Sequence, residues 1–255
     1  MTDDTTRDVP SPGTPGQLAE LSRSTSRRGF LRVVGLGGAI AALPRLVVAC
    51  NSDSPTEPSN GIPGTGEPLL IDFASGDTAI LQLASVMEQI EADFYARVVA
   101  AFETSNITAS EQTVLTEIRD HELGHRAFLD GTLGEAANGP ATTTFRGISF
   151  ADRAAVLTAA RAIEDLAIAT YNGAGQYLTA PETLLAIAKI VSVEGRHSST
   201  IRDLQEPKNG AFSPAASDDV WRPTKSAASI QSYLVDKLGF VNPPTTFVQG
   251  PKGGG

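Results

Sequence analysis

The chain has 255 residues, 41% of them hydrophobic, so it is long enough for one good-sized core and too apolar for wholesale disorder. Its 29 Asp and Glu residues outnumber its 20 Lys and Arg residues, which gives a formal net charge of −9. Because an acidic surface repels phosphate backbones, we do not expect the protein to bind nucleic acid.

Residues 1–49 have the features of a targeting segment rather than of a folded domain. Arg27 and Arg28 stand in the string SRRGFLR, and an apolar run rich in glycine and alanine follows them. This run is too short to span a membrane permanently, since a spanning helix takes about 20 residues. The segment resembles a twin-arginine export signal, which is removed from the mature protein.

Cys50 is the only cysteine, so no intrachain disulfide can form. It ends the string VVAC, which resembles a bacterial lipobox, whose cysteine becomes the lipidated first residue. The alternative is that Arg27 and Arg28 are a chance basic pair and Cys50 an ordinary thiol, but three motifs in register favour the export signal. We therefore expect an exported protein of the cell envelope or periplasm, held at a membrane by a lipid on Cys50.

Removal of the signal would make the protein more acidic. Residues 1–49 carry six basic and four acidic side chains, so the mature chain would keep 14 basic and 25 acidic ones, a net charge of −11.

The mature chain should begin with a tether and continue as one helical domain. Residues 50–74 are rich in proline, serine, glycine and threonine, a composition typical of flexible linkers. We expect the domain to cover residues 75–205. Over residues 77–102, apolar side chains recur with the period of a helix and do not alternate as they would in a strand.

Capping signals predict three further helices, over residues 108–133, 149–177 and 179–204. The first opens with the capping box TASE, at Thr108, and should stop at Gly134. The second opens with SFAD, a weaker signal because Asp replaces the usual Glu or Gln. The third opens with TAPE, whose proline suits the first turn of a helix.

The loop lengths predict how these helices connect. Short turns join the first helix to the second and the third to the fourth, so each pair should form an antiparallel hairpin. At about 3.3 Å per residue, the link over residues 134–149 can run the length of the bundle. We therefore expect an all-α four-helix bundle, made of two antiparallel hairpins joined by a long crossover. The C-terminal extension, residues 206–255, should add one short amphipathic helix and a disordered tail.

The string HELGH at residues 121–125 fits the motif H-E-x-x-H. In zinc peptidases the two histidines bind the metal and the glutamate acts as general base. Such an enzyme needs a third ligand, but no later histidine falls at the spacing of the extended motif, and Glu164 would have to replace it. The β-sheet that usually lines the cleft of these enzymes is not evident in the sequence either.

A glutamate followed three residues later by a histidine occurs twice in the chain. This repeat suggests that the Glu-x-x-His part of HELGH, and not the whole string, is the metal-binding motif. Glu122 and His125 lie in the second predicted helix, and Glu194 and His197 lie in the fourth. At this spacing both side chains of a pair lie on one face of a helix and can bind the same metal ion.

The first and third predicted helices repeat one another as well. Glu88 aligns with Glu164, and each is followed seven residues later by a tyrosine, Tyr95 or Tyr171. One helix and one turn separate each of these glutamates from the Glu-x-x-His pair of the same hairpin. All these polar residues can therefore meet halfway along the bundle.

This pattern resembles that of the ferritin-like superfamily, the di-iron or di-manganese carboxylate proteins that include bacterioferritins, rubrerythrins and manganese catalases. Their ligands are one glutamate from each of two helices and a Glu-x-x-His pair from each of the other two. The resemblance covers about residues 75–205 and implies two iron or manganese ions. It also implies that Glu122 and Glu194 bridge the two ions and that Glu88 and Glu164 are terminal carboxylates. His125 and His197 would each bind one ion.

Four further residues can act next to these ligands. The resemblance implies that Tyr95 and Tyr171 hydrogen-bond to the ligands and orient them, although both could be plain core residues. Glu91, one turn after Glu88, is a candidate for an additional or alternative ligand, but its counterpart in the repeat is Ala167, so we favour Glu88. His121 either contacts a ligand or faces solvent. Four carboxylates balance two divalent ions, and mixed oxygen and nitrogen ligation suits iron or manganese.

Two classes of function follow from the resemblance. The first is a redox enzyme that acts on a small oxidant or on metal ions, as a ferroxidase, peroxidase or catalase. The second is a non-catalytic envelope protein that binds metal and protects against stress or desiccation. A zinc peptidase is a minor third interpretation. A lipid anchor on a long tether argues against a closed iron-storage cage, but it is compatible with a homodimer.

Overall fold

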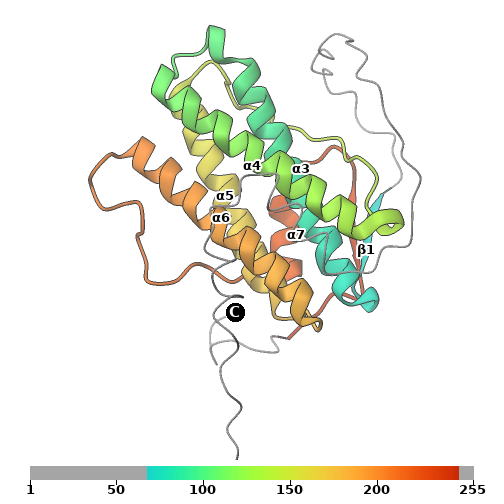
Figure 1. Ribbon diagram of the computed structural model, residues 1–255. Helices are drawn as coiled ribbons and strands as arrows, with labels where there is room; N and C mark the ends of the chain where they lie inside the picture. The colour runs from blue at the N-terminus through green and yellow to red at the C-terminus, as the bar shows by residue number, and fades with distance from the viewer. Residues whose placement is uncertain (1–67, 247–255) are drawn as a thin grey trace, which may run out of the picture. The chain divides into compact units, whose positions relative to one another are not determined.

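The computed structural model describes residues 68–246, so the expected export signal, the lipobox cysteine, most of the tether and the last nine residues lie outside it. The described chain is mostly helical, which confirms the all-α class. Its four long helices are α3 (Asp77–Ala100), α4 (Ala109–Leu133), α5 (Arg153–Gly175) and α6 (Pro181–Gln205) (Figure 1). A shorter helix, α7 (Pro223–Gln231), follows in the C-terminal extension. Among these residues, no helix is both long enough and apolar enough to cross a membrane.

The long helices form two antiparallel hairpins. In the first hairpin, Ser85 near the start of α3 donates a hydrogen bond to Asp130 near the end of α4. In the second, Arg153 at the start of α5 donates a hydrogen bond to the backbone carbonyl of Leu204 at the end of α6. The two hairpins pack together mainly through α3 and α5.

The connection between the hairpins follows α3 from one end to the other. At its start, the side chain of Gln82 donates a hydrogen bond to the carbonyl of Ala136. Midway, the side-chain amide of Gln89 bonds to both the carbonyl and the N–H of Ala141. At its end, Asn106 in the α3–α4 turn accepts the first backbone N–H of α5. The connection is therefore the long crossover that the loop length predicted.

The capping box predicted at the start of α4 is confirmed. Thr108 is the N-cap, and its side chain and that of Glu111 each accept the backbone N–H of the other residue. The N–H of Thr108 lies 3.0 Å from Glu111 Oε2. Gly134 ends the helix with a φ of 54°, in the left-handed region that favours glycine.

Pro181 stands in the first turn of α6 as predicted, but the caps predicted for α5 and α6 were wrong. The N-cap of α5 is Asp152 and not Ser149, because the Asp152 carboxylate accepts the backbone N–H two residues on. At the start of α6, Thr179 does not cap the helix. The Asp77 carboxylate, from the start of α3, instead accepts the N–H groups of Thr179 and Ala180 at 2.8 and 2.9 Å. A local motif could not reveal this cap, because its carboxylate comes from the other hairpin.

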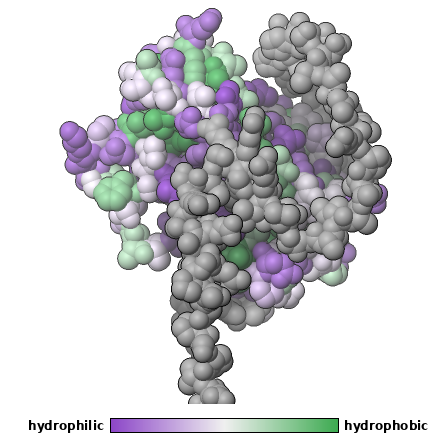
Figure 2. Space-filling model, viewed as in Figure 1, coloured by the Kyte–Doolittle hydropathy of each residue, from purple (hydrophilic) through white to green (hydrophobic). Residues whose placement is uncertain are grey.

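The hydrophobic core lies between the four long helices, and each of them contributes to it. Phe94 of α3, Leu115 of α4, Ile163 of α5 and Ile201 of α6 are all completely buried. On the face of the molecule seen in Figure 2, hydrophobic and hydrophilic residues are interspersed. Burial of apolar surface contributes about 25 cal/mol per Å². This core therefore holds the four helices, and the polar side chains they carry, at fixed positions.

Two short strands were not predicted. Strand β1 (Leu69–Asp72) pairs in parallel with strand β2 (Leu238–Val241). Each strand has only four residues, too few for an alternating pattern to stand out in the sequence. Residues 69–74, expected to be the end of the tether, therefore belong to the fold, and the C-terminal extension contains a strand as well as a helix.

The C-terminal extension packs closely on α5 at Gly173. The backbone N–H of Trp221 donates a 2.9 Å hydrogen bond to the carbonyl of Ala169, one turn before this glycine. A Cβ atom on Gly173 would lie only 1.6 Å from the carbonyl oxygen of Trp221. The close approach of the two backbones therefore requires glycine here.

Candidate metal centre

All six predicted metal ligands meet in the middle of the bundle. One glutamate comes from each of α3 and α5, and a glutamate with a histidine comes from each of α4 and α6: Glu88, Glu164, Glu122 with His125, and Glu194 with His197. The four glutamates are 0% exposed, and the two histidines are at most 9% exposed. Bulk solvent therefore does not hydrate these charges.

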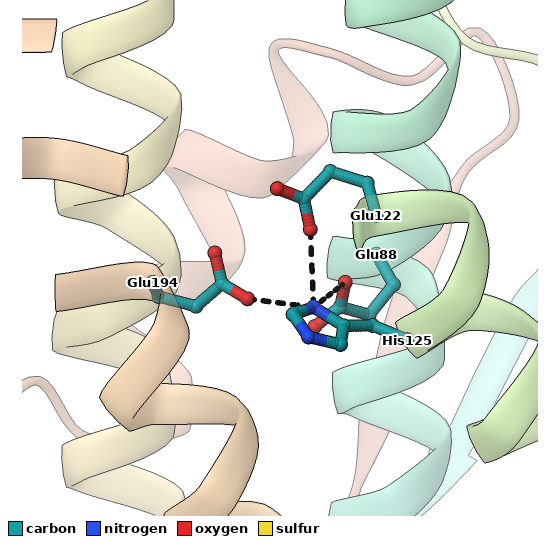
Figure 3. Close-up of side chains that lie close together, drawn as sticks. All are labelled: Glu88, Glu122, His125 and Glu194. Atoms are coloured by element: carbon teal, nitrogen blue, oxygen red, sulfur yellow. Dashed lines mark hydrogen bonds and ion pairs between the residues drawn. The ribbon is translucent and has the colours of Figure 1, made fainter. Parts of the chain in front are cut away.

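The first cluster surrounds His125, as Figure 3 shows. The Nδ1 atom of this histidine lies 2.8 Å from Glu194 Oε1, 3.2 Å from Glu122 Oε2 and 3.4 Å from Glu88 Oε2. These four residues can each offer one ligand atom, and the four atoms lie within 4.8 Å of one another. The cluster can therefore hold one metal ion.

The second cluster surrounds His197 in the same way. Its Nδ1 atom lies 2.7 Å from Glu122 Oε1, 3.1 Å from Glu194 Oε2 and 3.7 Å from Glu164 Oε2. The four ligand atoms again lie within 4.8 Å of one another.

Glu122 and Glu194 belong to both clusters. Glu122 directs Oε2 to His125 and Oε1 to His197. Glu194 directs Oε1 to His125 and Oε2 to His197. Each carboxylate thus offers a different oxygen to each cluster, which is how a carboxylate bridges two metal ions.

Buried carboxylate oxygens that make no hydrogen bond lie at the same place. Buried polar side-chain atoms normally have hydrogen-bond partners. Among residues 68–246, six buried side-chain atoms lack such a hydrogen bond. Four are single oxygens of the cluster glutamates, each facing Nδ1 of His125 or His197 at 2.7, 2.8, 3.4 or 3.7 Å, and the other two are both oxygens of Glu91. Such oxygens are costly to bury unless a cation or a proton compensates them. Four carboxylates and two imidazoles form a donor set that fits iron or manganese.

Tyr95 and Tyr171 hold Glu164 and Glu88 across the two hairpins. The hydroxyl of Tyr95 donates a 2.5 Å hydrogen bond to Glu164 Oε1, and that of Tyr171 donates one of 2.5 Å to Glu88 Oε1. In each glutamate the other oxygen, Oε2, faces the histidine of its cluster. Each tyrosine therefore fixes a carboxylate with one oxygen directed at the cluster.

Burial sets the protonation of most of the carboxylates. It raises the pKa of Glu88 to about 8 and that of Glu164 well above its usual value. Glu194 differs, because hydrogen bonds from His125 and His197 outweigh burial and lower its pKa to about 2. In the metal-free protein, the cluster therefore retains protons on some of its carboxylates at neutral pH.

The carboxylates in turn keep protons on the histidines. Burial lowers the pKa of His197, but hydrogen bonds to Glu122 and Glu194 outweigh it and raise this pKa to about 11. Burial likewise opposes the charged form of His125, and the carboxylates, led by Glu88, outweigh it and raise the pKa. A metal ligand must be deprotonated, so metal binding here releases protons.

Glu91 lies beside the clusters and belongs to neither of them. It is 0% exposed, and neither of its carboxylate oxygens has a hydrogen-bond partner. Burial raises its pKa well above the usual value, and the negative charges of Glu194 and Glu88 raise it further. Of the two glutamates that α3 offers, the structure thus places Glu88 in a cluster and Glu91 next to it.

His121 contacts the centre from outside. Its Nδ1 atom lies 3.0 Å from Nε2 of His197, and the two rings stack with their centroids 5.2 Å apart. A zinc peptidase would need His121 and His125 on one ion, with Glu122 free to act as base. Glu122 instead belongs to both clusters and His121 to neither, so the arrangement does not fit that enzyme.

A comparison with known protein families identifies the domain that carries both clusters. The ferritin-like domain family matches residues 76–207, more than half of the chain. The chain belongs to the ferritin-like domain family. Its ferritin-like domain runs from the residue before α3 to just beyond α6, so it includes every residue of both clusters. A comparison with curated proteins found no match.

In the described part of this ferritin-like chain, the two clusters contain no residue that the sequence analysis had not named. The sequence did not reveal which glutamate each tyrosine would contact, although the Glu-x6-Tyr repeat was a signal that the pairs were related. The contact between His121 and His197 left no sequence signal, because it depends on how close α4 and α6 come to each other.

Proposed function

We propose that this ferritin-like protein binds two iron or manganese ions in its two clusters and uses them to turn over oxygen or hydrogen peroxide. The observation that carries the proposal is the shared pair of carboxylates, Glu122 and Glu194. Each directs one oxygen to each cluster, so two ions would be bridged twice. Four carboxylates would also balance the four positive charges of two divalent ions.

When bound, a pair of redox-active ions supplies the two electrons that convert hydrogen peroxide and two protons into two water molecules. The protein's own residues set the conditions for this reaction. Tyr95 and Tyr171 keep the terminal carboxylates oriented, which preserves the geometry of the ligands. The complete burial of the four glutamates excludes bulk water and large substrates. A small oxidant, or a metal ion that is itself oxidised, suits such a site, and a reductant outside the chain returns the electrons.

The same burial also fits a second function, that of a non-catalytic envelope protein that binds metal and protects against oxidative or desiccation stress. Ligands that are 0% exposed hold their ions away from oxidants in solution. Turnover of peroxide distinguishes the two functions, since a protective metal-binding protein has no need for it.

We propose further that the protein acts at the cell envelope, exported by the twin-arginine route and anchored by a lipid on Cys50. The motifs at residues 26–32 and 47–50 support this location. If it is correct, Cys50→Ala moves the protein from the membrane fraction to the soluble fraction of the envelope. Retention of this variant in the membrane fraction would contradict the lipid anchor.

Metal analysis followed by an activity assay tests the proposed function. We expect protein isolated from its own envelope to carry two iron or manganese ions per chain and to consume hydrogen peroxide. Glu122→Gln replaces one of the two shared oxygens with an amide nitrogen and removes the negative charge, so its side chain can no longer offer an oxygen to both clusters, and it should abolish both properties. Two ions without turnover would favour the protective function, and a single zinc ion per chain would contradict a centre of two redox-active ions. Protein that binds no metal under any loading condition would overturn the proposal.

A further inference from the structure

Among residues 68–246, Glu91 is a buried acid that belongs to neither cluster. It lies one turn after Glu88 on α3, is completely buried, and has no hydrogen-bond partner on either oxygen. In the described residues, every other buried side-chain atom without a partner belongs to one of the four cluster glutamates, and each of those contributes only one.

Other buried acids in the structure do have partners. Glu111 bonds to the N–H of Thr108 and to Arg153, and Asp236 accepts the N–H of Thr142. Burying a carboxyl group without partners destabilises a fold, and a neutral side chain at the same position would avoid that penalty. The unpaired carboxylate of Glu91 is therefore best explained by a ligand that the bundle binds.

The surroundings of Glu91 indicate which ligand this is. Its strongest electrostatic neighbours are Glu194 and Glu88, which both belong to the cluster around His125. On a helix, residues three apart lie on the same face, so Glu91 faces the same side of α3 as Glu88. The equivalent position in the second hairpin is Ala167, which has no ligand atom.

We propose that Glu91 supplies a fifth carboxylate to the metal-loaded centre, next to the ion held by Glu88 and His125, and so makes the two ion positions unequal. The inference rests on the proposed function, since it requires two bound ions. Four carboxylates balance two divalent ions. Five carboxylates balance one divalent and one trivalent ion. Glu91 therefore stabilises the state in which one of the two ions has lost an electron.

The test is a titration of the full-length protein with Mn²⁺, followed by calorimetry, in the wild type and in Glu91→Gln. Glu91→Gln should still bind two ions, because the six cluster ligands remain. One of the two affinities should fall at least tenfold, as is usual when a group next to a metal site is lost, while the other stays within about twofold. The EPR spectrum of the loaded protein should change, and the mixed-valence state should accumulate less on partial oxidation.

Two further variants separate a role in metal binding from a role in folding. Glu103→Gln, an exposed glutamate on the turn after α3, is the matched control and should behave as the wild type. Glu91→Asp keeps the charge but shortens the side chain, so it should restore part of the lost affinity. Without metal, Glu91→Gln should unfold at a higher temperature than the wild type, because it removes a buried acid. A lower temperature would show a structural role instead and overturn the inference.

The outcomes also separate this inference from the proposed function. Two affinities equal to those of the wild type, with an unchanged EPR spectrum, would overturn the role of Glu91 alone. If the wild type itself fails to bind two ions, the proposed function fails, and this inference fails with it.

Discussion

Tyr95 on α3 donates a 2.5 Å hydrogen bond to Glu164 on α5, so a residue of one hairpin orients a predicted ligand of the other. Tyr95→Phe removes this bond and leaves the ring in place. We expect metal affinity at the cluster of Glu164 and His197 to fall by about 10–100-fold, measured by calorimetry. Tyr177→Phe, which removes a hydroxyl that bonds to the backbone at Thr246, is the control and should leave both affinities unchanged. Equal affinities in both variants would show that the Tyr95 hydroxyl does not support the centre.

The shared and unshared glutamates should differ in how many ions they control. Glu122 offers an oxygen to both clusters, whereas Glu164 offers one only to the cluster of His197. After loading and dialysis, Glu164→Gln should retain about one ion per chain, and Glu122→Gln should retain almost none. Elemental analysis measures this directly. The same metal content in the two variants would contradict the bridging position of Glu122.

The stability of the metal-free protein should fall as the pH rises from about 5 to about 8. The pKa of Glu88 is about 8 in the folded protein and 4.5 in the unfolded chain, so in this window the folded state keeps a proton that the unfolded state has lost. His197, with a pKa of about 11 against 6.5, acts in the same direction above pH 6.5. Each such proton lowers the free energy of unfolding by up to about 1.4 kcal/mol per pH unit. Urea unfolding at pH 5, 6.5 and 8 measures the slope.

Saturating metal should reverse this dependence. Because the ligands bind metal only when deprotonated, the gain in stability from Mn²⁺ should grow from pH 5 to pH 8. The control is Glu122→Gln, in which metal should produce little gain at any pH. A metal-free wild type whose stability rises over this window would show that the buried cluster does not hold its protons as described.

His121 should affect one ion position and not the other. If Nδ1 of His197 binds metal, its Nε2–H donates to Nδ1 of His121, the atom 3.0 Å away. His121→Ala removes this acceptor, so the affinity of the His197 cluster should fall about tenfold or more. His121→Asn, whose side-chain oxygen can accept the same hydrogen bond, should restore most of it. Equal losses in the two variants would mean that the contact is only one of packing.

Gly173 should be far less tolerant of substitution than its neighbour in α5. In Gly173→Ala the new Cβ would meet the Trp221 carbonyl at 1.6 Å, so either the C-terminal extension or the helix must move. Overpacking of this kind destabilises by about 1–3 kcal/mol. Gly175→Ala is the control, since nothing lies within 4 Å of its Cβ position, and it should be neutral or slightly stabilising. Thermal unfolding of the two variants would show the difference, and equal midpoints would refute it.

The bundle was predictable because its signals are local and repeated. Helical periodicity and the capping box at Thr108 determined where the helices lie, and the internal repeat showed which positions face one another. The cap of α6 was not predictable in this way, because Asp77 belongs to the other hairpin. The strands β1 and β2 escaped notice for a related reason, since each is stable only when paired with a segment distant in the sequence.

The residues of the two clusters were predictable because metal binding requires particular residue types at fixed helical spacing. Only Glu-x-x-His occurs in both hairpins, which showed that the first histidine of HELGH, His121, is not part of the repeated motif. In the structure His121 lies next to the clusters and belongs to neither. The surroundings of Glu91 could not be read from the sequence. Whether a glutamate one turn after Glu88 meets solvent, a cation or other carboxylates depends on how four helices close around it.

The pairing of β1 with β2 also places a constraint on when the protein can finish folding. A ribosome synthesises β1 before the bundle and β2 after it, so the sheet must wait for the whole intervening chain. At roughly 5–20 residues per second, the segment between α6 and β2 adds a few seconds after the last ligand, His197, has been made. During that interval the helices that carry the ligands can pack while β1 still exposes an unpaired edge, which is where nascent chains are prone to associate with one another.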